Sequence, residues 1–381
     1  MASGMGIGVM CRIDQQAFWQ TVAGLEVLTF PMKAKAKSIA AEIRGSCQAA
    51  LLWEAGPVAE AAHRASVPRR LGPPDRTLKK YLTQPLACAE LALDHRVRHY
   101  LSAVEEMGIQ TANAEFFAPA GLGAEPAPGS VLVCPDSDYG PSHEWLLDRW
   151  LEISNNLTDE GCRVTVAGLG GGRGFGQSLA RHLGERARFW DASVLSDSLP
   201  ELAAHALVIA ADGSLPHLAA HTGATCVTLF GPNDPVWKRP LGRRHSIVRH
   251  PVECAPCLLA KCAMDGRCQH ALEVARVWQA VKANLQSSIF NIQYQAGSPF
   301  PKQARAEDHE QTPENTGERL IAEAPHQVAS KPSGDRRGKT HCGDDLPIDE
   351  VVRAGIVESG GQRRDNDDRH GGGHSLFVLQ P

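Results

Sequence analysis

Residues 205–217, which read HALVIAADGSLPH, decide the fold of this chain. Residues 206–210 form a short, uninterrupted apolar run, which is typical of a strand buried in a parallel sheet. A tight polar turn of Asp212, Gly213 and Ser214 follows, and Pro216 lies in the first turn of the next helical pattern. The stretch therefore predicts a strand, a turn and a helix start, which together form part of an α/β unit.

The same alternation continues on both sides of this stretch. Before it, the patterns predict strands at 130–134 and 163–167 and helices at 145–157, 177–183 and 199–204. After it, they predict a helix at 215–221, a strand at 225–230 and a helix at 272–285. Strands that alternate with helices through short connections indicate a parallel sheet. We therefore expect a Rossmann-like domain that binds ligands at the carboxyl ends of its strands.

The chain divides into three segments of different composition. A Pro/Gly-rich stretch at 116–129 separates this domain from a first half that is also α/β. In that half, strands are expected at 7–11, 25–30 and 49–53 and helices at 34–44 and 57–64. We predict an N-terminal domain over 1–120 and a C-terminal domain over 121–289.

The last segment, 290–381, is predicted to be a disordered tail. Residues 301–375 contain only nine Leu, Ile, Val or Phe, too few to offset the entropy of ordering the segment. We favour a solvated tail over a metal site at His370 and His374. We also expect that removing the tail would change the melting temperature by only a few degrees.

Charge and hydropathy exclude several classes of protein. The 39 Lys and Arg are balanced by 43 Asp and Glu, so the chain lacks the basic excess of a general nucleic-acid coat. No run of 18 apolar residues is present, and residues 1–10 lack the pattern of a secretory signal. We therefore expect a cytoplasmic protein with no nucleic-acid partner.

Two loops on the same sheet edge carry the candidate binding residues. The turn that contains Asp212, Gly213, Ser214 and His217 precedes a helix, whose free N–H groups can bind an anion. The alternative is that Asp212 or Ser214 only caps the helix. The loop 134–145 contains Tyr139, Gly140 and His143 and is either a second part of the site or an ordinary βα loop.

Two further segments leave their interpretation open. The glycine run 168–176 fits a dinucleotide-binding pattern only loosely. A basic loop suits a diphosphate but could equally be a solvated surface; it contains Lys238, Arg239, Arg243, Arg244 and Arg249.

The cysteine-rich segment also has two interpretations. Cys254, Cys257, Cys262 and Cys268 are close enough in sequence to bind zinc or a cluster, although their spacing is not that of the usual zinc motifs. We favour structural thiols, and we assign no metal ligand and no cofactor.

The motifs Asp212–Ala224, Thr228–Pro235 and Cys254–Cys257 resemble glycosyltransferase family 9, the ADP-heptose:lipopolysaccharide heptosyltransferases. The loop Tyr139–Trp145 is similar to the family's Gly-x-x-Lys-x-Trp stretch. In the first half, Val67–Gly72 and His95–Tyr100 resemble family segments near the third strand and the linker.

This resemblance implies a GT-B-like fold, in which two Rossmann-like domains face a cleft. It implies metal-independent transfer of a heptose from ADP-heptose to a lipid A–core acceptor, with inversion at C1. The acceptor would lie at the inner membrane surface, where the enzyme would be peripheral. Carried over by position, the residues at the sugar diphosphate would be Asp212, Gly213, Ser214 and His217, with Tyr139, Gly140 and His143 beside the phosphates.

Two departures from the family pattern matter. His143 stands where the family has Lys, so a titratable group replaces a fixed cation. The first strand of the family and its Gly-Asp loop, which supplies the catalytic base, have no counterpart here. Asp14, Glu26, Glu42 and Glu54 all lack that context. We expect either that the protein starts upstream or that it is a non-catalytic nucleotide-sugar-binding relative, and we assign no catalytic residue.

Overall fold

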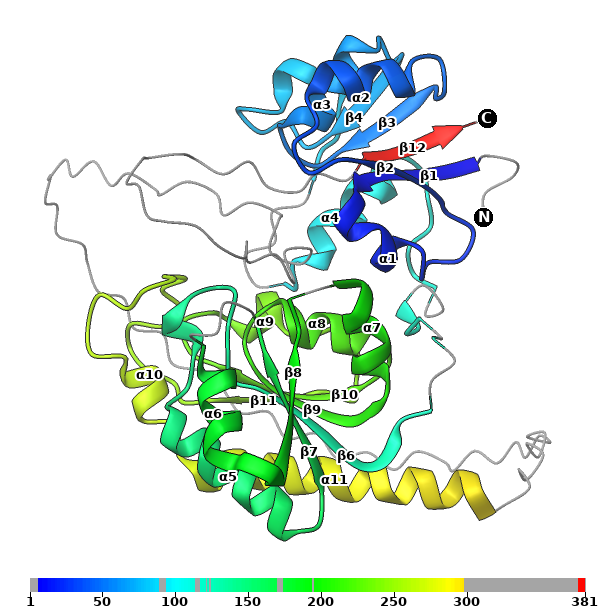
Figure 1. Cartoon of the computed structure of the whole chain (residues 1–381). Helices are drawn as coiled ribbons and strands as arrows, with labels where there is room; N and C mark the ends of the chain where they lie inside the picture. The colour runs from blue at the N-terminus through cyan, green and yellow to red at the C-terminus, as the bar shows by residue number, and fades with distance from the viewer. Residues whose placement is uncertain are drawn as a thin grey trace, which may run out of the picture.

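The computed structural model describes residues 6–88, 94–113, 117–120, 122, 125–169, 174–193, 195–297 and 376–380. These residues form two α/β units, each built around a six-stranded sheet (Figure 1). The first unit holds the N-terminal part of the chain, and the second begins with the strand at 127–134.

The second sheet has the strand order β11-β10-β9-β6-β7-β8, and all of its pairings are parallel. Its strands are β6 (Ala127–Cys134), β7 (Arg163–Gly168), β8 (Ala187–Asp191), β9 (His205–Ala211), β10 (Thr225–Phe230) and β11 (Ser246–Arg249). The chain builds outward from β6 in one direction and from β9 in the other. The carboxyl ends of β6 and β9 therefore form the topological switch point, where ligands bind in such sheets.

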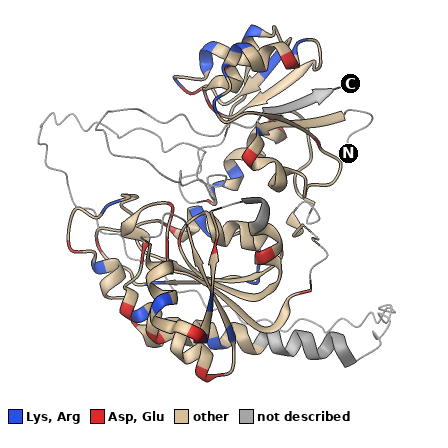
Figure 2. Ribbon diagram, viewed as in Figure 1, with Lys and Arg blue, Asp and Glu red and all other residues tan. Residues whose placement is uncertain are grey.

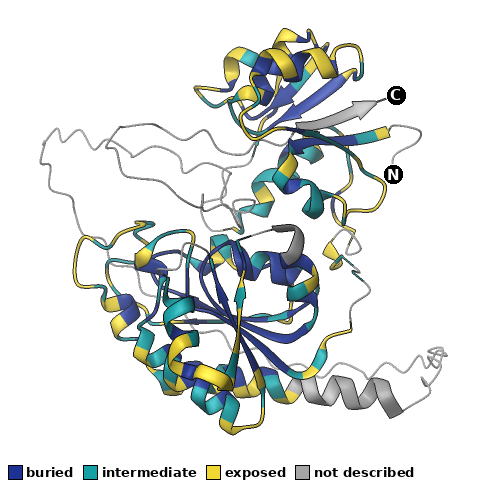
Figure 3. Cartoon of the chain, viewed as in Figure 1, coloured by how far each residue is buried: buried dark blue, intermediate teal, exposed yellow. Residues whose placement is uncertain are grey.

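Helices cover both faces of this sheet, because successive residues of a buried strand point to opposite sides. On one face, Val131 and Ile209 pack with residues of α5 (Leu147–Asp159), α6 (Phe175–Leu183) and α11 (Val274–Gly297). On the other face, Leu132 and Val208 pack with α7 (Leu195–Ala203) and α8 (Ser214–His221). Figure 3 shows buried residues along the strands and exposed residues on the outer faces of the helices.

The first sheet has the order β2-β1-β12-β3-β4-β5. Its strands are β1 (Gly6–Arg12), β2 (Glu26–Phe30), β3 (Ala49–Leu52), β4 (Arg69–Gly72), β5 (Gln84–Pro85) and β12 (Leu376–Gln380). Leu52 packs with α2 (Ala36–Ile43) and α3 (Pro57–Arg64), whereas Leu51 packs on the opposite face with Ala103 of α4 (Val97–Glu106).

β12 is the exception in this sheet, because it runs antiparallel to both of its neighbours. It pairs with β1 from Met10 opposite Leu376 to Gly6 opposite Gln380, and with β3 from Leu52 opposite Leu376. The strand comes from the C-terminal end of the chain and lies between the two halves of an otherwise parallel sheet (Figure 1). Without it, β1 and β3 would lack a partner on the sides that face each other.

The tail differs from expectation in two places. α11 continues to Gly297, past the predicted domain end at residue 289, and 376–380 form β12. The rest of the predicted tail, 298–375, including His370 and His374, lies outside the described residues. The low apolar content applies to 301–375 and stops before the short apolar run 376–379, which lies in β12.

Direct contacts join the two units. Phe18 of α1 (Gln16–Trp19) packs against the α7–α8 core cluster, and its ring lies 4.7 Å from that of His221. Thr21 Oγ1 lies 2.7 Å from His221 Nε2. Within the described part of the chain, no helix is both long enough and apolar enough to cross a membrane.

Candidate functional site

Two loops meet at the switch point of the second sheet. Residues 135–146 follow β6, and Asp212 and Gly213 connect β9 to α8. Ser137 Oγ donates a hydrogen bond to the backbone oxygen of Asp212 at 2.6 Å, which ties the loops together. The structure thus brings the two predicted groups of site residues to one place.

Asp212 lies at the centre of a buried polar cluster. Its Oδ2 accepts hydrogen bonds from His143 Nδ1 at 3.1 Å and from Asn233 Nδ2 at 2.6 Å. The Asp212 side chain is fully buried and that of His143 is 3 % exposed. Burial raises the pKa of Asp212, while the hydrogen bond and charge of His143 oppose that rise. Asp212 Oδ1 has no hydrogen-bond partner among the described residues.

Asp138, which sequence reasoning did not single out, stabilises the start of α8. Its carboxylate accepts hydrogen bonds from the backbone N–H of Ser214 at 2.8 Å and from Ser214 Oγ at 2.5 Å. A Cβ on Gly213 would lie 2.7 Å from Asp138 Oδ1, which explains the glycine. The N–H of Ser214 is thus taken by a carboxylate from the neighbouring loop, whereas the hydrogen bonds of the Asp212 side chain go to His143 and Asn233.

A second carboxylate explains the described part of the glycine run. Asp136 accepts hydrogen bonds from the backbone N–H groups of Leu169 at 3.0 Å and Gly176 at 2.9 Å. A Cβ on Gly174 would lie 2.6 Å from Asp136 Oδ2. These glycines make room for a carboxylate of the same chain at the start of α6. Residues 170–173 of the run lie outside the described residues.

Tyr139 covers the buried cluster from the side of the loop. Its ring stands edge-on to that of His143, with centroids 5.6 Å apart and an angle of 81°. The ammonium of Lys238, the last residue of α9 (Pro235–Lys238), lies 5.0 Å from the centroid of the Tyr139 ring. Lys238, a member of the predicted basic loop, thus lies beside the site.

Gly140 fits the loop tightly against the cysteine-rich segment. Its φ of +114° is one that residues with a side chain rarely adopt, and a Cβ there would lie 2.5 Å from the backbone oxygen of Ala260. The backbone N–H of Ser142 donates to the same oxygen at 3.2 Å. The cysteine-rich segment therefore supports the shape of the 139–143 loop.

His217 lies in the first turns of α8 and is partly buried. Desolvation lowers its pKa to about 4, and the nearby His95 and Lys238 act in the same direction. At neutral pH it is therefore uncharged and can offer a hydrogen bond but not the positive charge that its position suggested.

The four clustered cysteines are free thiols. Burial raises the pKa of Cys268, and Cys254, Cys262 and Cys257 add to that rise, which places the four near one another. Among the residues that the structure describes, no three His, Cys, Asp or Glu side chains are arranged to hold one metal ion.

The first unit presents two carboxylates after strands that flank β12. Asp14 follows β1, and both of its oxygens are engaged by Arg12, at 3.1 and 2.8 Å. Glu54 follows β3 and is partly buried. Glu26 and Glu42 are exposed and lie on β2 and α2.

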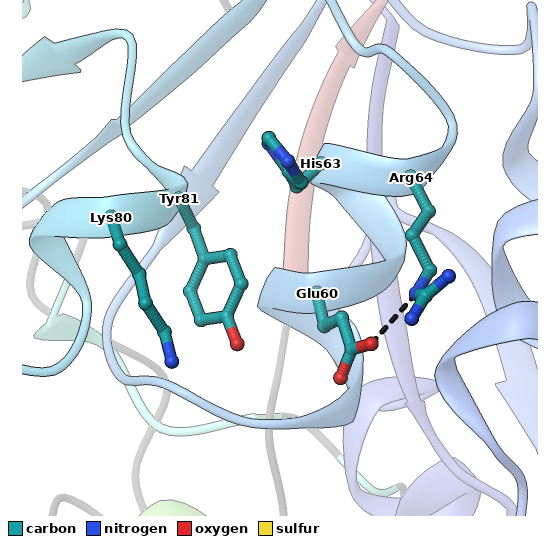
Figure 4. Close-up of a pocket in the computed structure, with 5 residues that line it drawn as sticks. All are labelled: Glu60, His63, Arg64, Lys80 and Tyr81. Carbon is teal, nitrogen blue, oxygen red and sulfur yellow. Dashed lines mark hydrogen bonds and ion pairs between the residues drawn. The ribbon is translucent and has the colours of Figure 1, made fainter.

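A cavity of about 620 Å³ lies elsewhere, in the first unit. Figure 4 shows the Glu60–Arg64 ion pair on α3 and the side chains of Lys80 and Tyr81 opposite. None of its lining residues, which also include His63, is buried. This open surface holds none of the predicted site residues.

Comparison with known proteins agrees with this arrangement. The family model for glycosyltransferase family 9 (heptosyltransferase) matches residues 94–267. This segment is therefore similar to glycosyltransferase family 9. The family 9 match includes both loops of the candidate site and the cysteine-rich segment, but it begins after the strands of the first unit.

Curated relatives show the same similarity over a shorter range. The chain is 26% identical over 124 residues to lipopolysaccharide heptosyltransferase 2 of Escherichia coli (31% of the chain, 36% of the relative). It is 25% identical over 133 residues to lipooligosaccharide heptosyltransferase 2 of Haemophilus influenzae (34% of the chain, 38% of the relative). The matched part thus spans little more than a third of the length of these relatives.

Solved structures show that the fold extends over most of the chain. The E. coli ADP-heptose lps heptosyltransferase II superposes with a TM-score of 0.58 at 17% identity and covers 74% of this chain and 89% of that one. A family 9 glycosyl transferase from Veillonella parvula superposes with a TM-score of 0.60 at 13% identity and covers 73% and 87%. The chain therefore has the GT-B-like fold that its motifs predicted.

Proposed function

We propose that this chain transfers a heptose from ADP-heptose to the inner core of lipopolysaccharide. The main support is the meeting of the Tyr139–His143 loop and the Asp212–His217 turn at the switch point of a sheet in a family 9 segment. The matched relatives are named as lipopolysaccharide and lipooligosaccharide heptosyltransferases, and one matched structure is named for ADP-heptose.

The donor would lie across the carboxyl ends of β6 and β9. The turn at Gly213 and Ser214 and the neutral His217 would face the sugar diphosphate, and Tyr139 and Gly140 would flank it. Asp212 holds His143 and Asn233 in place, and its Oδ1 retains the capacity to accept a hydrogen bond. Asp212 itself is fully buried.

The reaction would be a direct displacement with inversion and without a metal ion, as the family resemblance implies. A hydroxyl of the lipid A–core acceptor, held on the side of the first unit at the membrane surface, would attack C1 of the heptose. The bond from C1 to the diphosphate oxygen would break, ADP would leave, and the hydroxyl proton would pass to a base. The carboxylates of Asp14 and Glu54 follow the strands beside β12, but neither lies in a Gly-Asp loop of the family kind.

The test is a transfer assay with the full chain, ADP-heptose and a heptose-deficient lipid A–core acceptor. The readouts are ADP release, the mass gained by the acceptor and the anomeric configuration of the product, with and without a chelator. We expect ADP release to match the mass gained by the acceptor, an inverted product, and a rate that the chelator does not change.

Variants of the two carboxylates refine this assay. A loss of about a hundredfold or more relative to the unaltered chain in Asp14→Asn or in Glu54→Gln alone would identify that carboxylate as the base. Donor binding without any transfer would contradict the proposed activity and would support a non-catalytic nucleotide-sugar-binding protein instead.

A further inference from the structure

His143 is buried in this protein, although it stands where the similar family motif has the fixed cation Lys. Its side chain is only 3 % exposed. Its Nδ1 bonds to Asp212, and the ring of Tyr139 stands edge-on against it. His143, enclosed by Asp212 and Tyr139, therefore contributes to the packing of the loop and is not placed to contact a diphosphate.

The same edge of the sheet is rich in negative charge. Asp136, Asp138 and Asp212 all lie within the two meeting loops, and each carboxylate already accepts hydrogen bonds from the protein. Such a site repels a diphosphate unless a cation offsets the charge.

Lys238 is placed to supply that charge. Its ammonium lies 5.0 Å from the centroid of the Tyr139 ring, and its charge lowers the pKa of both Asp212 and His217. Its position is set by the short helix α9, whose start is capped by Asp234 through the N–H of Val236 at 2.9 Å. A cation over an aromatic face is held there by the negative charge of the ring face.

We propose that Lys238, seated on Tyr139, neutralises the diphosphate of the bound nucleotide in place of the buried His143. This assignment rests on the proposed function, because it requires a nucleotide diphosphate in the site. It makes Lys238 a binding residue of the donor and Tyr139 the residue that positions it.

The test measures ADP and AMP binding to the full chain by calorimetry. Lys238→Met should weaken ADP binding about tenfold, equal to about 1.4 kcal/mol. It should change AMP binding much less, because AMP lacks the second phosphate. Lys238→Arg, which keeps the charge, should restore most of the preference for ADP over AMP. The matched control is Arg243→Met, which removes the same charge from an exposed position of the same basic loop.

The outcomes separate this assignment from the proposed function. An unchanged ADP-to-AMP ratio in Lys238→Met, or an equal loss in Arg243→Met, would overturn the assignment while leaving a nucleotide-binding protein. If the unaltered chain bound neither nucleotide at millimolar concentration, the proposed function would fail and this assignment with it.

Discussion

At the scale of single residues, Asp212 organises the candidate site. It is the common hydrogen-bond acceptor of His143 and Asn233, which come from the two neighbouring loops. Replacing it with Ala would leave two buried polar groups without an acceptor, which is costly. The backbone N–H of Ser214 at the start of α8 is bound by Asp138 and not by Asp212.

We expect Asp212→Ala to weaken ADP-heptose binding or turnover at least tenfold, about 1.4 kcal/mol. Calorimetry and the transfer assay measure this directly. Asp148→Ala, which removes an exposed carboxylate from the start of α5, is the matched control. An unchanged affinity in Asp212→Ala would show that the cluster does not shape the donor site.

His205 gives a prediction about pH. Its side chain is 6 % exposed, and it lies 2.7 Å from the Glu201 backbone oxygen and 3.0 Å from Thr165 Oγ1. Desolvation lowers its pKa to about 4, with Arg188 and Arg163 acting in the same direction. As the pH falls, the imidazole takes up a proton near pH 6.5 in the unfolded chain but only near pH 4 in the folded chain. The stabilisation is therefore complete above pH 6.5 and is lost as the pH falls towards 4.

We expect the free energy of unfolding of the unaltered chain to fall over this pH range more steeply than that of His205→Gln. Between pH 6.5 and 4, the unaltered chain should lose at most roughly 3 kcal/mol more unfolding free energy than His205→Gln does. Denaturant unfolding at several pH values measures it, and His182→Gln, at an exposed position of α6, is the control. Parallel curves for the unaltered chain and His205→Gln would contradict the assignment of the buried neutral imidazole.

At the scale of elements, β12 changes what is expected of the C-terminal end. It pairs on both sides, with β1 and with β3, so it closes the middle of the first sheet. The expectation that the whole tail can be removed at little cost does not take these pairings into account.

We expect deletion of residues 376–381 to lower the melting temperature of the first unit by more than about 5 °C, because roughly 1 kcal/mol shifts a domain of this size by 4–8 °C. Scanning calorimetry of the full chain resolves this, with ADP binding as a check that the second unit is intact. A six-residue deletion at 329–334 is the length-matched control. Equal melting curves for the two deletions would show that β12 contributes no stability.

At the scale of the whole molecule, the proposed donor site belongs to one of the two units. Every residue of the proposed donor site lies in the second unit, which has its own sheet and two core clusters (Figure 1). Basic and acidic residues are interspersed along its outer helices (Figure 2). The first unit contributes Phe18 and Thr21 to the contact with α8.

We therefore expect a fragment of residues 125–297 to bind ADP-heptose with an affinity within about tenfold of the full chain, a difference of at most about 1.4 kcal/mol. Calorimetry measures the binding, and a cooperative thermal transition confirms that the fragment is folded. Phe18 packs against the α7–α8 cluster of this unit, so the full chain with Phe18→Ala is the control for the loss of that contact. No heat at millimolar donor from a folded fragment would place part of the donor site in the first unit.

The sequence by itself determined the order and type of most elements. Local apolar patterns predicted β10 at 225–230 and α3 at 57–64 with the bounds that the structure has, and they brought the loops after β6 and β9 to one edge. These features follow from neighbours in the chain, whose spacing carries the period of a strand or helix. The family motifs lie in these same segments, so the GT-B-like fold was predictable as well.

Only the tertiary structure decided which groups meet. It paired β12 with strands from the opposite end of the chain, gave the start of α8 to Asp138, enclosed His143 and placed Lys238 over Tyr139. None of these contacts has a periodic signature, because each joins residues that are distant in sequence and is selected by packing and by the cost of burying an unpaired polar group. The charge at the carboxyl edge of the second sheet therefore depends on how distant residues pack there and cannot be read from the motif alone.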